Sequence, residues 1–160
     1  MKAATAAQIK RELQYRSSEE LEQLCLRLSR FKKENKELLT YLLFEKDDEA
    51  AYVHHIKEYI DERLLEVNRS SSYYIKKSLR KILREIKKFI RYSDVKETEV
   101  ELLLFYCTRL VEFKPSIREN RVMMNVFHRQ MDLIRSKIKG LHEDLQHDYT
   151  KEVNSLIEKL

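Results

Sequence analysis

Glycine and proline are almost absent from this chain of 160 residues, which contains one of each. Average usage is about 7% for glycine and about 5% for proline. Tight turns between strands depend on these two residues, so their scarcity argues against a β-rich fold. It also argues against active sites built on loops with unusual backbone angles. The composition therefore predicts an all-α protein.

A disulfide framework and long apolar runs are missing as well. The two cysteines, Cys25 and Cys107, fall on apolar faces of expected helices and lack the spacing of a redox pair. We expect both thiols to be reduced and buried. No stretch has the length of a membrane span, and residues 1–16 lack the apolar core of a secretory signal. We therefore expect a cytoplasmic protein without membrane contact.

Helical periodicity and capping residues predict an irregular bundle of about seven helices. The expected helices span residues 4–15, 18–31, 36–46, 48–67, 73–92, 95–113 and 115–160. Pro115 suits the first position of the last helix. Residues 1–114 should form a helical core domain, and residues 115–160 a long C-terminal helix or a helical hairpin that packs on the core or on a partner. We favour one long helix, because its apolar phase continues through Gly140.

Two of these helices are apolar almost all round. The first covers 36–46 and includes Leu42, Leu43 and Phe44, and the other contains the run 102–106. Such helices are typical of buried central elements. In both places an amphipathic helix comes before the apolar one, so a short HEAT- or armadillo-like helical stack is the alternative to an irregular bundle.

Three segments, 25–28, 31–45 and 141–146, resemble a small family of uncharacterised bacterial helical proteins. They read CLRL, FKKENKELLTYLLFE and LHEDLQ and cover roughly a quarter of the chain. They contain no signature of known chemistry. The resemblance implies a bacterial cytoplasmic origin and no particular activity.

The helix expected at 73–92 carries nearly all of the net charge. It contains eight cations against one acid, Glu85, so its charge is +7 (eight minus one) in a chain of net charge +5. The cations fall within an arc of about 140° on one helix face, and apolar residues fill the opposite face. We call these cations the basic ridge: Lys76, Lys77, Arg80, Lys81, Arg84, Lys87, Lys88 and Arg91.

Three interpretations of the basic ridge stay open at this stage. It could be a solvated face partly paired with acids of the neighbouring helices, chiefly Glu58, Asp61, Glu62, Glu66, Glu97, Glu99 and Glu101. It could instead bind a polyanion such as a nucleic acid, with Tyr73 on the same face for base stacking. An acidic protein partner is the third interpretation. No helix-turn-helix, zinc-knuckle or RNP motif is present to decide among them.

The last predicted helix contains an apolar seam with three- and four-residue steps. We call its central part the C-terminal seam: Met131, Ile134, Ile138, Leu141, Leu145, Tyr149, Val153 and Leu156. The seam could pack against the earlier helices of the same chain. One long helix, however, would outreach the shorter helices available to cover it. The surplus could pair with a second copy or with a helix of another protein.

The histidines do not form a convincing chemical site. His142 and His147 are five residues apart rather than the four of a zinc-binding helix, and Asp144 with His147 only approximates a di-iron motif. His54 and Glu58 lie one turn apart without a nucleophile or an oxyanion donor. We expect no catalytic residue, metal, cofactor or small-molecule substrate.

The leading hypothesis is therefore a non-enzymatic helical module for protein–protein interaction or scaffolding. It would act on a protein partner or on a second copy through the C-terminal seam. The alternative hypothesis is nucleic-acid or other polyanion binding through the basic ridge.

Overall fold

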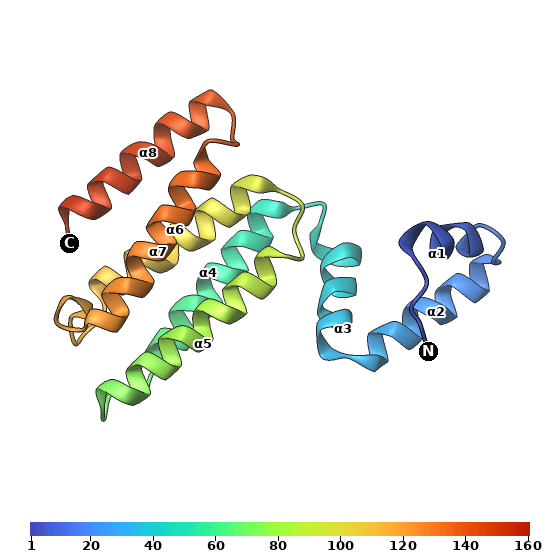
Figure 1. Ribbon diagram of the computed structural model, residues 1–160, viewed down its shortest axis with the longest axis horizontal. Coiled ribbons are helices and arrows are strands. Elements are labelled where there is room, and N and C mark those ends of the chain that lie inside the picture. Colours follow the sequence, from blue (N-terminus) through green and yellow to red (C-terminus); the bar gives the residue numbers. More distant parts are fainter. The chain divides into compact units, whose positions relative to one another are not determined.

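The computed structural model describes residues 1–160 and contains eight α-helices with one π turn and one 3-10 turn (Figure 1). An all-α protein is confirmed, and the count is eight helices rather than seven. The elements are α1 (Ala6–Leu13), α2 (Ser18–Phe31), α3 (Lys33–Thr40), the π turn Tyr41–Glu45, α4 (Glu49–Leu65), α5 (Ser72–Ile90), α6 (Lys96–Glu112), the 3-10 turn Ile117–Glu119, α7 (Arg121–Ile138) and α8 (Glu143–Glu158).

The chain divides into two compact units, Met1–Phe44 and Glu45–Leu160. We call them the N-terminal unit and the C-terminal unit. The predicted division lay after Lys114, but α6 and α7, on either side of that residue, pack against each other in the C-terminal unit. The compact units therefore separate far earlier in the sequence than expected.

Capping boxes start both α1 and α2 in the N-terminal unit. The Thr5 and Ser17 hydroxyls accept hydrogen bonds from the backbone N–H groups of Gln8 and Glu20. In turn, the side-chain oxygens of Gln8 and Glu20 accept hydrogen bonds from the backbone N–H groups of Thr5 and Ser17. Each such pair satisfies two N–H groups that lack helical partners. The Ser17 box confirms the sequence expectation for the start of this helix.

The N-terminal unit has little interior of its own. None of the residues in α1, α2 and α3 is buried. The prediction of a buried helix over 36–46 is wrong, since α3 ends at Thr40 and Leu42, Leu43 and Phe44 are exposed. The prediction that Cys25 is buried is also wrong. Periodicity identified apolar faces in this region, but other elements cover them only in part, and Tyr41 of the π turn is the buried exception.

The C-terminal unit is organised around α6, which packs against α4, α5, α7 and α8. Leu102, Leu103, Leu104 and Tyr106 of the consecutive apolar run are buried, as is Cys107. The Tyr106 hydroxyl donates a hydrogen bond to the Leu79 carbonyl at 2.8 Å, and the Tyr52 hydroxyl donates one to the Phe89 carbonyl at 2.9 Å. These bonds join α4 and α6 to the backbone of α5. The predicted central, buried character of this helix is confirmed.

Asn120, rather than Pro115, marks the start of α7. The Asn120 side-chain oxygen accepts hydrogen bonds from the N–H groups of Val122 and Met123 at 3.1 and 3.2 Å. Pro115 follows a cis peptide bond and precedes the 3-10 turn. The prediction of Pro115 at the first position of the last helix is therefore wrong.

The chain reverses between α7 and α8, so the favoured prediction of one long C-terminal helix is wrong. These two helices form a hairpin at the C-terminal end of the chain, labelled α7 and α8 in Figure 1. His142 has extended backbone angles at the start of α8, and its Nδ1 accepts a hydrogen bond from the Asp144 N–H at 3.4 Å. The Gln146 side chain donates to the Leu141 carbonyl at 2.8 Å and so binds α8 to the turn. Local capping therefore ends one helix and starts the next, although the helical spacing of apolar residues continues across the turn.

We expect Gly140→Ala to preserve this turn. No residue in the chain has a positive φ, and a Cβ at position 140 would meet only the Lys137 carbonyl oxygen at an ordinary 3.5 Å. Alanine restricts the unfolded chain, so the free energy of unfolding should rise by about 0.4–1 kcal/mol. Urea denaturation followed by circular dichroism measures this change. A loss of stability of similar size would contradict it.

Candidate functional site

The basic ridge lies on the outward face of α5. The Ser71 hydroxyl caps this helix by accepting a hydrogen bond from the Tyr74 N–H at 3.3 Å. The opposite face is buried and packs on α4 and α6; it comprises Ile75, Leu79, Ile82, Leu83 and Ile86. This packing directs the cations outward. Six of the eight are exposed, and Lys76 and Lys88 are half-buried.

The acids in the second half of α4 and at its end form no ion pair with the basic ridge. Asp61 forms a bidentate ion pair with Arg109 of α6, with Arg109 Nε to Asp61 Oδ1 at 2.6 Å. Glu58 lies 3.5 Å from His54, and Glu66 pairs with Arg63. Glu62 forms no ion pair. The ion pairs expected between the ridge and Glu58, Asp61, Glu62 and Glu66 are therefore absent from the structure.

The acids of α6 are bound elsewhere too. Glu101 forms an ion pair with Lys57 of α4 at 2.6 Å, and Glu99 forms one with Lys137 of α7 at 2.7 Å. The Tyr149 hydroxyl of α8 donates a hydrogen bond to Glu97 at 2.8 Å. These three acids hold the helices of the C-terminal unit together and do not pair with the ridge.

Glu85, the acid on α5 itself, points to α4. The Tyr59 hydroxyl donates a hydrogen bond to its carboxylate at 2.6 Å, and Arg63 Nε lies 3.8 Å from it. Burial, together with this hydrogen bond, raises the pKa of Tyr59 to about 12. Glu85 therefore serves the contact between α4 and α5 and does not screen the outward face.

Seven ridge cations form no ion pair within the chain: Lys76, Lys77, Arg80, Lys81, Arg84, Lys87 and Arg91. The ammonium of Lys88 lies over the Phe89 ring, 4.7 Å from its centroid. Because these seven side chains form no ion pair, their positive charges stay uncompensated on the outward surface of α5. Such a surface attracts anions from solution.

Part of the basic ridge borders a hollow of about 540 Å³, which we call the ridge hollow. Its lining comprises Tyr73, Lys76, Lys77, Arg80, Arg84 and Val122. Val122 belongs to the first turn of α7, and the Asn120 side chain before it donates a hydrogen bond to the Ser72 hydroxyl at 2.9 Å. This bond holds the starts of α5 and α7 together. No acid lines the hollow, so an anion that enters it meets cations and apolar surface.

The C-terminal seam lies mostly in the core of the C-terminal unit. Six of its eight residues are buried, and Leu141 and Leu145 are half-buried. The hairpin of α7 and α8 folds this seam onto α6 and onto itself. The expected surplus of apolar surface depended on one long helix, and the turn at residues 139–142 removes it.

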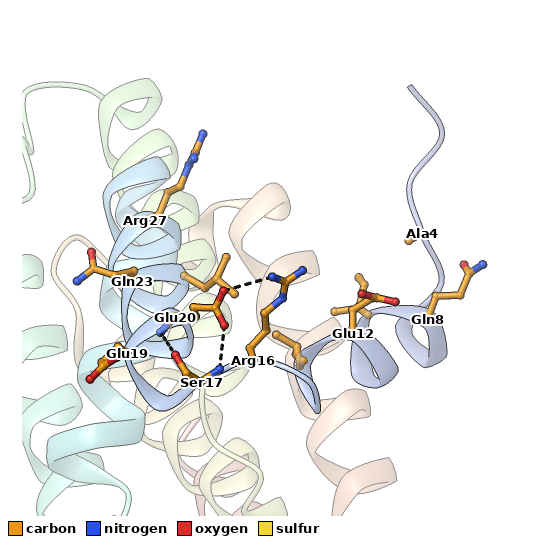
Figure 2. A pocket seen from close by; sticks show the side chains of 12 residues that line it. Ala4, Gln8, Glu12, Arg16, Ser17, Glu19, Glu20, Gln23 and Arg27 are labelled. Carbon is orange, nitrogen blue, oxygen red and sulfur yellow. Dashed lines mark hydrogen bonds and ion pairs between the residues drawn. The ribbon is translucent and has the colours of Figure 1, made fainter.

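The N-terminal unit exposes an apolar stripe that the sequence analysis did not single out. Leu24, Leu28 and Phe31 follow one face of α2 at four- and three-residue steps, and 42%, 60% and 76% of their respective surfaces are exposed. An open groove of about 770 Å³ between α1 and α2 continues from Leu24 to Ile9 and Leu13 (Figure 2). The regular spacing of this stripe was the signal in the sequence.

The groove of Figure 2 has a polar rim. Arg16 Nη1 pairs with Glu20 across the start of α2 at 3.3 Å, and Glu12, Glu19 and Arg27 also line it. All of its lining residues are exposed. Sites for small molecules instead bury most of the ligand surface. The groove is thus better suited to a helix than to a small ligand.

The histidine positions produce no assembled chemical centre. His54 and Glu58 are both solvent-exposed, and His142 caps α8 and lies 3.5 Å from Asp144. No group of three or more His, Cys, Asp or Glu side chains lies close enough together to hold a metal ion. Burial raises the pKa of the Cys107 thiol to about 12, so this thiol is not an activated nucleophile.

None of the eight helices has the length and apolar character that crossing a membrane requires. The resemblance to bacterial helical proteins stays a prediction. No protein-family model matches this chain, no curated protein matches its sequence, and no solved structure matches its fold.

Proposed function

We propose that this protein is a non-catalytic nucleic-acid-binding protein that contacts phosphates through the basic ridge. One observation carries the proposal: seven ridge cations have no ion-pair partner in the chain, although α4 and α6 supply acids nearby. Like charges on one helix face repel one another and weaken the folded state. A polyanion removes that repulsion and gains entropy when its own counterions are released.

The length of the ridge supports a nucleic acid as the polyanion. From Lys76 to Arg91 it extends about 22 Å along the helix axis at about 1.5 Å per residue. Phosphates on one strand of a duplex repeat about every 3.4 Å along its axis. The six exposed cations can therefore reach several phosphates of one strand, whereas a short acidic peptide would engage only part of the ridge.

A salt titration tests the proposal. If six phosphates are engaged, log K for a labelled DNA duplex should fall against log salt with a slope of about −5 between about 50 and 200 mM. Fluorescence anisotropy measures this slope. Absence of binding at the lowest salt would contradict the proposal, and so would a slope near zero. Equal competition by polyglutamate would favour an acidic protein partner instead.

A second candidate function is self-association through the N-terminal unit. The supporting observation is the exposed stripe of Leu24, Leu28 and Phe31 beside the open groove between α1 and α2. A second copy offers the same stripe, and a two-fold axis brings identical apolar faces together. This candidate keeps the predicted protein–protein interaction but moves it from the C-terminal seam to α2.

Sedimentation velocity tests this second candidate. The full chain should be a dimer at micromolar concentration. The double variant Leu28→Ser with Phe31→Ser should raise the dimer dissociation constant at least tenfold, because each substitution removes an apolar side chain that assembly would bury. Leu65→Ser is the control, because Leu65 is an exposed leucine on α4 in the other unit. A full chain that stays monomeric at the highest concentration would contradict self-association through this stripe.

Two finer expectations remain part of the proposal. Consecutive helices from α4 to α8 pack on their neighbours, which supports a short HEAT- or armadillo-like stack within the C-terminal unit. A cytoplasmic location stays a prediction from the sequence.

A further inference from the structure

The ridge hollow combines charged and apolar surface, and a purely electrostatic site would not need the apolar part. Lys76, Lys77, Arg80 and Arg84 supply positive charge, while Tyr73 and Val122 supply an aromatic ring and an aliphatic group. Phosphates require only the cations. The apolar groups therefore point to a part of the ligand that is not charged.

Tyr73 is placed to present its ring to such a ligand. It lies in the first turn of α5, 63% of its surface is exposed, and its hydroxyl makes no hydrogen bond within the chain. The Tyr74 ring packs edge-on against it, with centroids 5.5 Å apart and planes at 73°. This T-shaped contact orients the Tyr73 ring and occupies at most one of its faces, so at least one face stays available for stacking.

The surroundings of the Tyr73 ring suit a nucleobase. One turn of helix separates Tyr73 from Lys76 and Lys77, so a base on the ring would place its neighbouring phosphates near these cations. Val122 forms part of the lining from α7 and offers apolar contact. Exposed aromatic rings among cations are the usual platform on which proteins bind single strands, because every base has a π face.

We propose that the preferred ligand of the ridge is a single-stranded nucleic acid, one of whose bases stacks on Tyr73 in the ridge hollow. This inference rests on the proposed phosphate binding by the ridge. Bases in a duplex are stacked on one another and keep their faces covered, so a duplex gains only the phosphate contacts. A single strand gains both.

The direct test uses the absence of tryptophan from this chain. Tyr73→Trp introduces one tryptophan into the hollow, and stacking of a base should quench its fluorescence strongly when a single-stranded oligonucleotide is added. Tyr15→Trp is the matched control, because Tyr15 is an exposed tyrosine in the N-terminal unit. Quenching in the first variant and not in the second is the expected result.

The affinity test separates stacking from charge. Tyr73→Ala should weaken binding of a single strand about 5- to 150-fold, while Tyr73→Phe should retain it, since the ring is what stacks. The same alanine variant should leave unchanged the binding of a duplex and of an abasic strand with the same number of phosphates. Fluorescence anisotropy with the three labelled ligands measures these differences.

The outcomes distinguish the two proposals. If single strand, abasic strand and duplex bind equally and Tyr73→Ala changes none of them, phosphate binding stands and base stacking is overturned. If no ligand binds even at low salt, the proposed function itself fails. Unquenched Tyr73→Trp fluorescence in a complex that has formed would also overturn the stacking inference.

Discussion

Replacing Phe127 by alanine lowers the free energy of unfolding by about 3–5 kcal/mol, the cost of removing a fully buried phenyl ring. Phe127 lies on the buried face of α7, which packs on the central helix α6, and none of its surface is exposed. A domain of ordinary stability has about 5–15 kcal/mol in total, so this variant should be close to unfolding. The melting temperature should fall by about 6–20 °C for a chain of this length.

Phe31→Ala is the matched control for this substitution. It removes the same ring from α2, where 76% of the Phe31 surface is exposed. Surface substitutions of this kind change stability by about 0.5 kcal/mol or less. Urea denaturation of both variants, followed by circular dichroism, gives the comparison. Equal losses of stability would contradict the assignment of Phe127 to the core and of Phe31 to the surface.

Reversing three charges of the basic ridge should weaken nucleic-acid binding at least about 100-fold. The variant combines Lys77→Glu, Arg80→Glu and Arg84→Glu, three exposed side chains that line the ridge hollow and form no ion pair. Three phosphate contacts are lost and three repulsions are added. The salt slope on duplex DNA should also decrease in magnitude from about −5 to about −3, since about 0.9 counterion is released per phosphate.

The control for this variant changes the net charge by the same amount at other sites. It combines Lys96→Glu, Lys139→Glu and Lys151→Glu, three exposed lysines without ion pairs near α6, α7 and α8. If the ridge is the binding surface, the control should lose no more than about threefold in affinity, the part due to overall attraction. Equal weakening by both triple variants would mean that net charge alone, and not the ridge, attracts the nucleic acid.

The ridge and its helix could be predicted well because their determinants are local. Ser71 caps α5, and cations and apolar residues alternate with the helical period, so position alone separates the two faces. The central position of α6 was equally predictable from its consecutive apolar residues. Both predictions depend on contacts within a few turns of one helix.

The partners of these faces could not be predicted in the same way. Seven acids on α4 and α6 were available to the ridge, but Arg109, Lys57 and Lys137 take Asp61, Glu101 and Glu99. The choice among partners depends on how α4, α6 and α7 approach one another in space. Helical period gives the direction of a side chain within its helix and not the neighbour that it meets.

The same limit explains the errors at α3 and at Gly140. An apolar helix is buried only where another element covers it, and nothing covers Leu43 and Phe44. The continuous phase through Gly140 is compatible with one long helix, but a hairpin buries Tyr149, Val153 and Leu156 in the C-terminal unit. Burial of this apolar surface favours the hairpin and opposes the loss of the helical hydrogen bonds that the turn gives up.

The amino-acid sequence by itself determined that the chain is helical, where most helices begin, and that one helix face concentrates the positive charge. These properties follow from side-chain size, capping and periodicity, which act over a few residues. Only the tertiary structure decided that Asp61, Glu99 and Glu101 bind elsewhere, that Val122 of α7 and Tyr73 line one hollow, and that most of the C-terminal seam is buried. Those outcomes depend on competition among distant side chains for the same partners, and packing of the helices settles that competition.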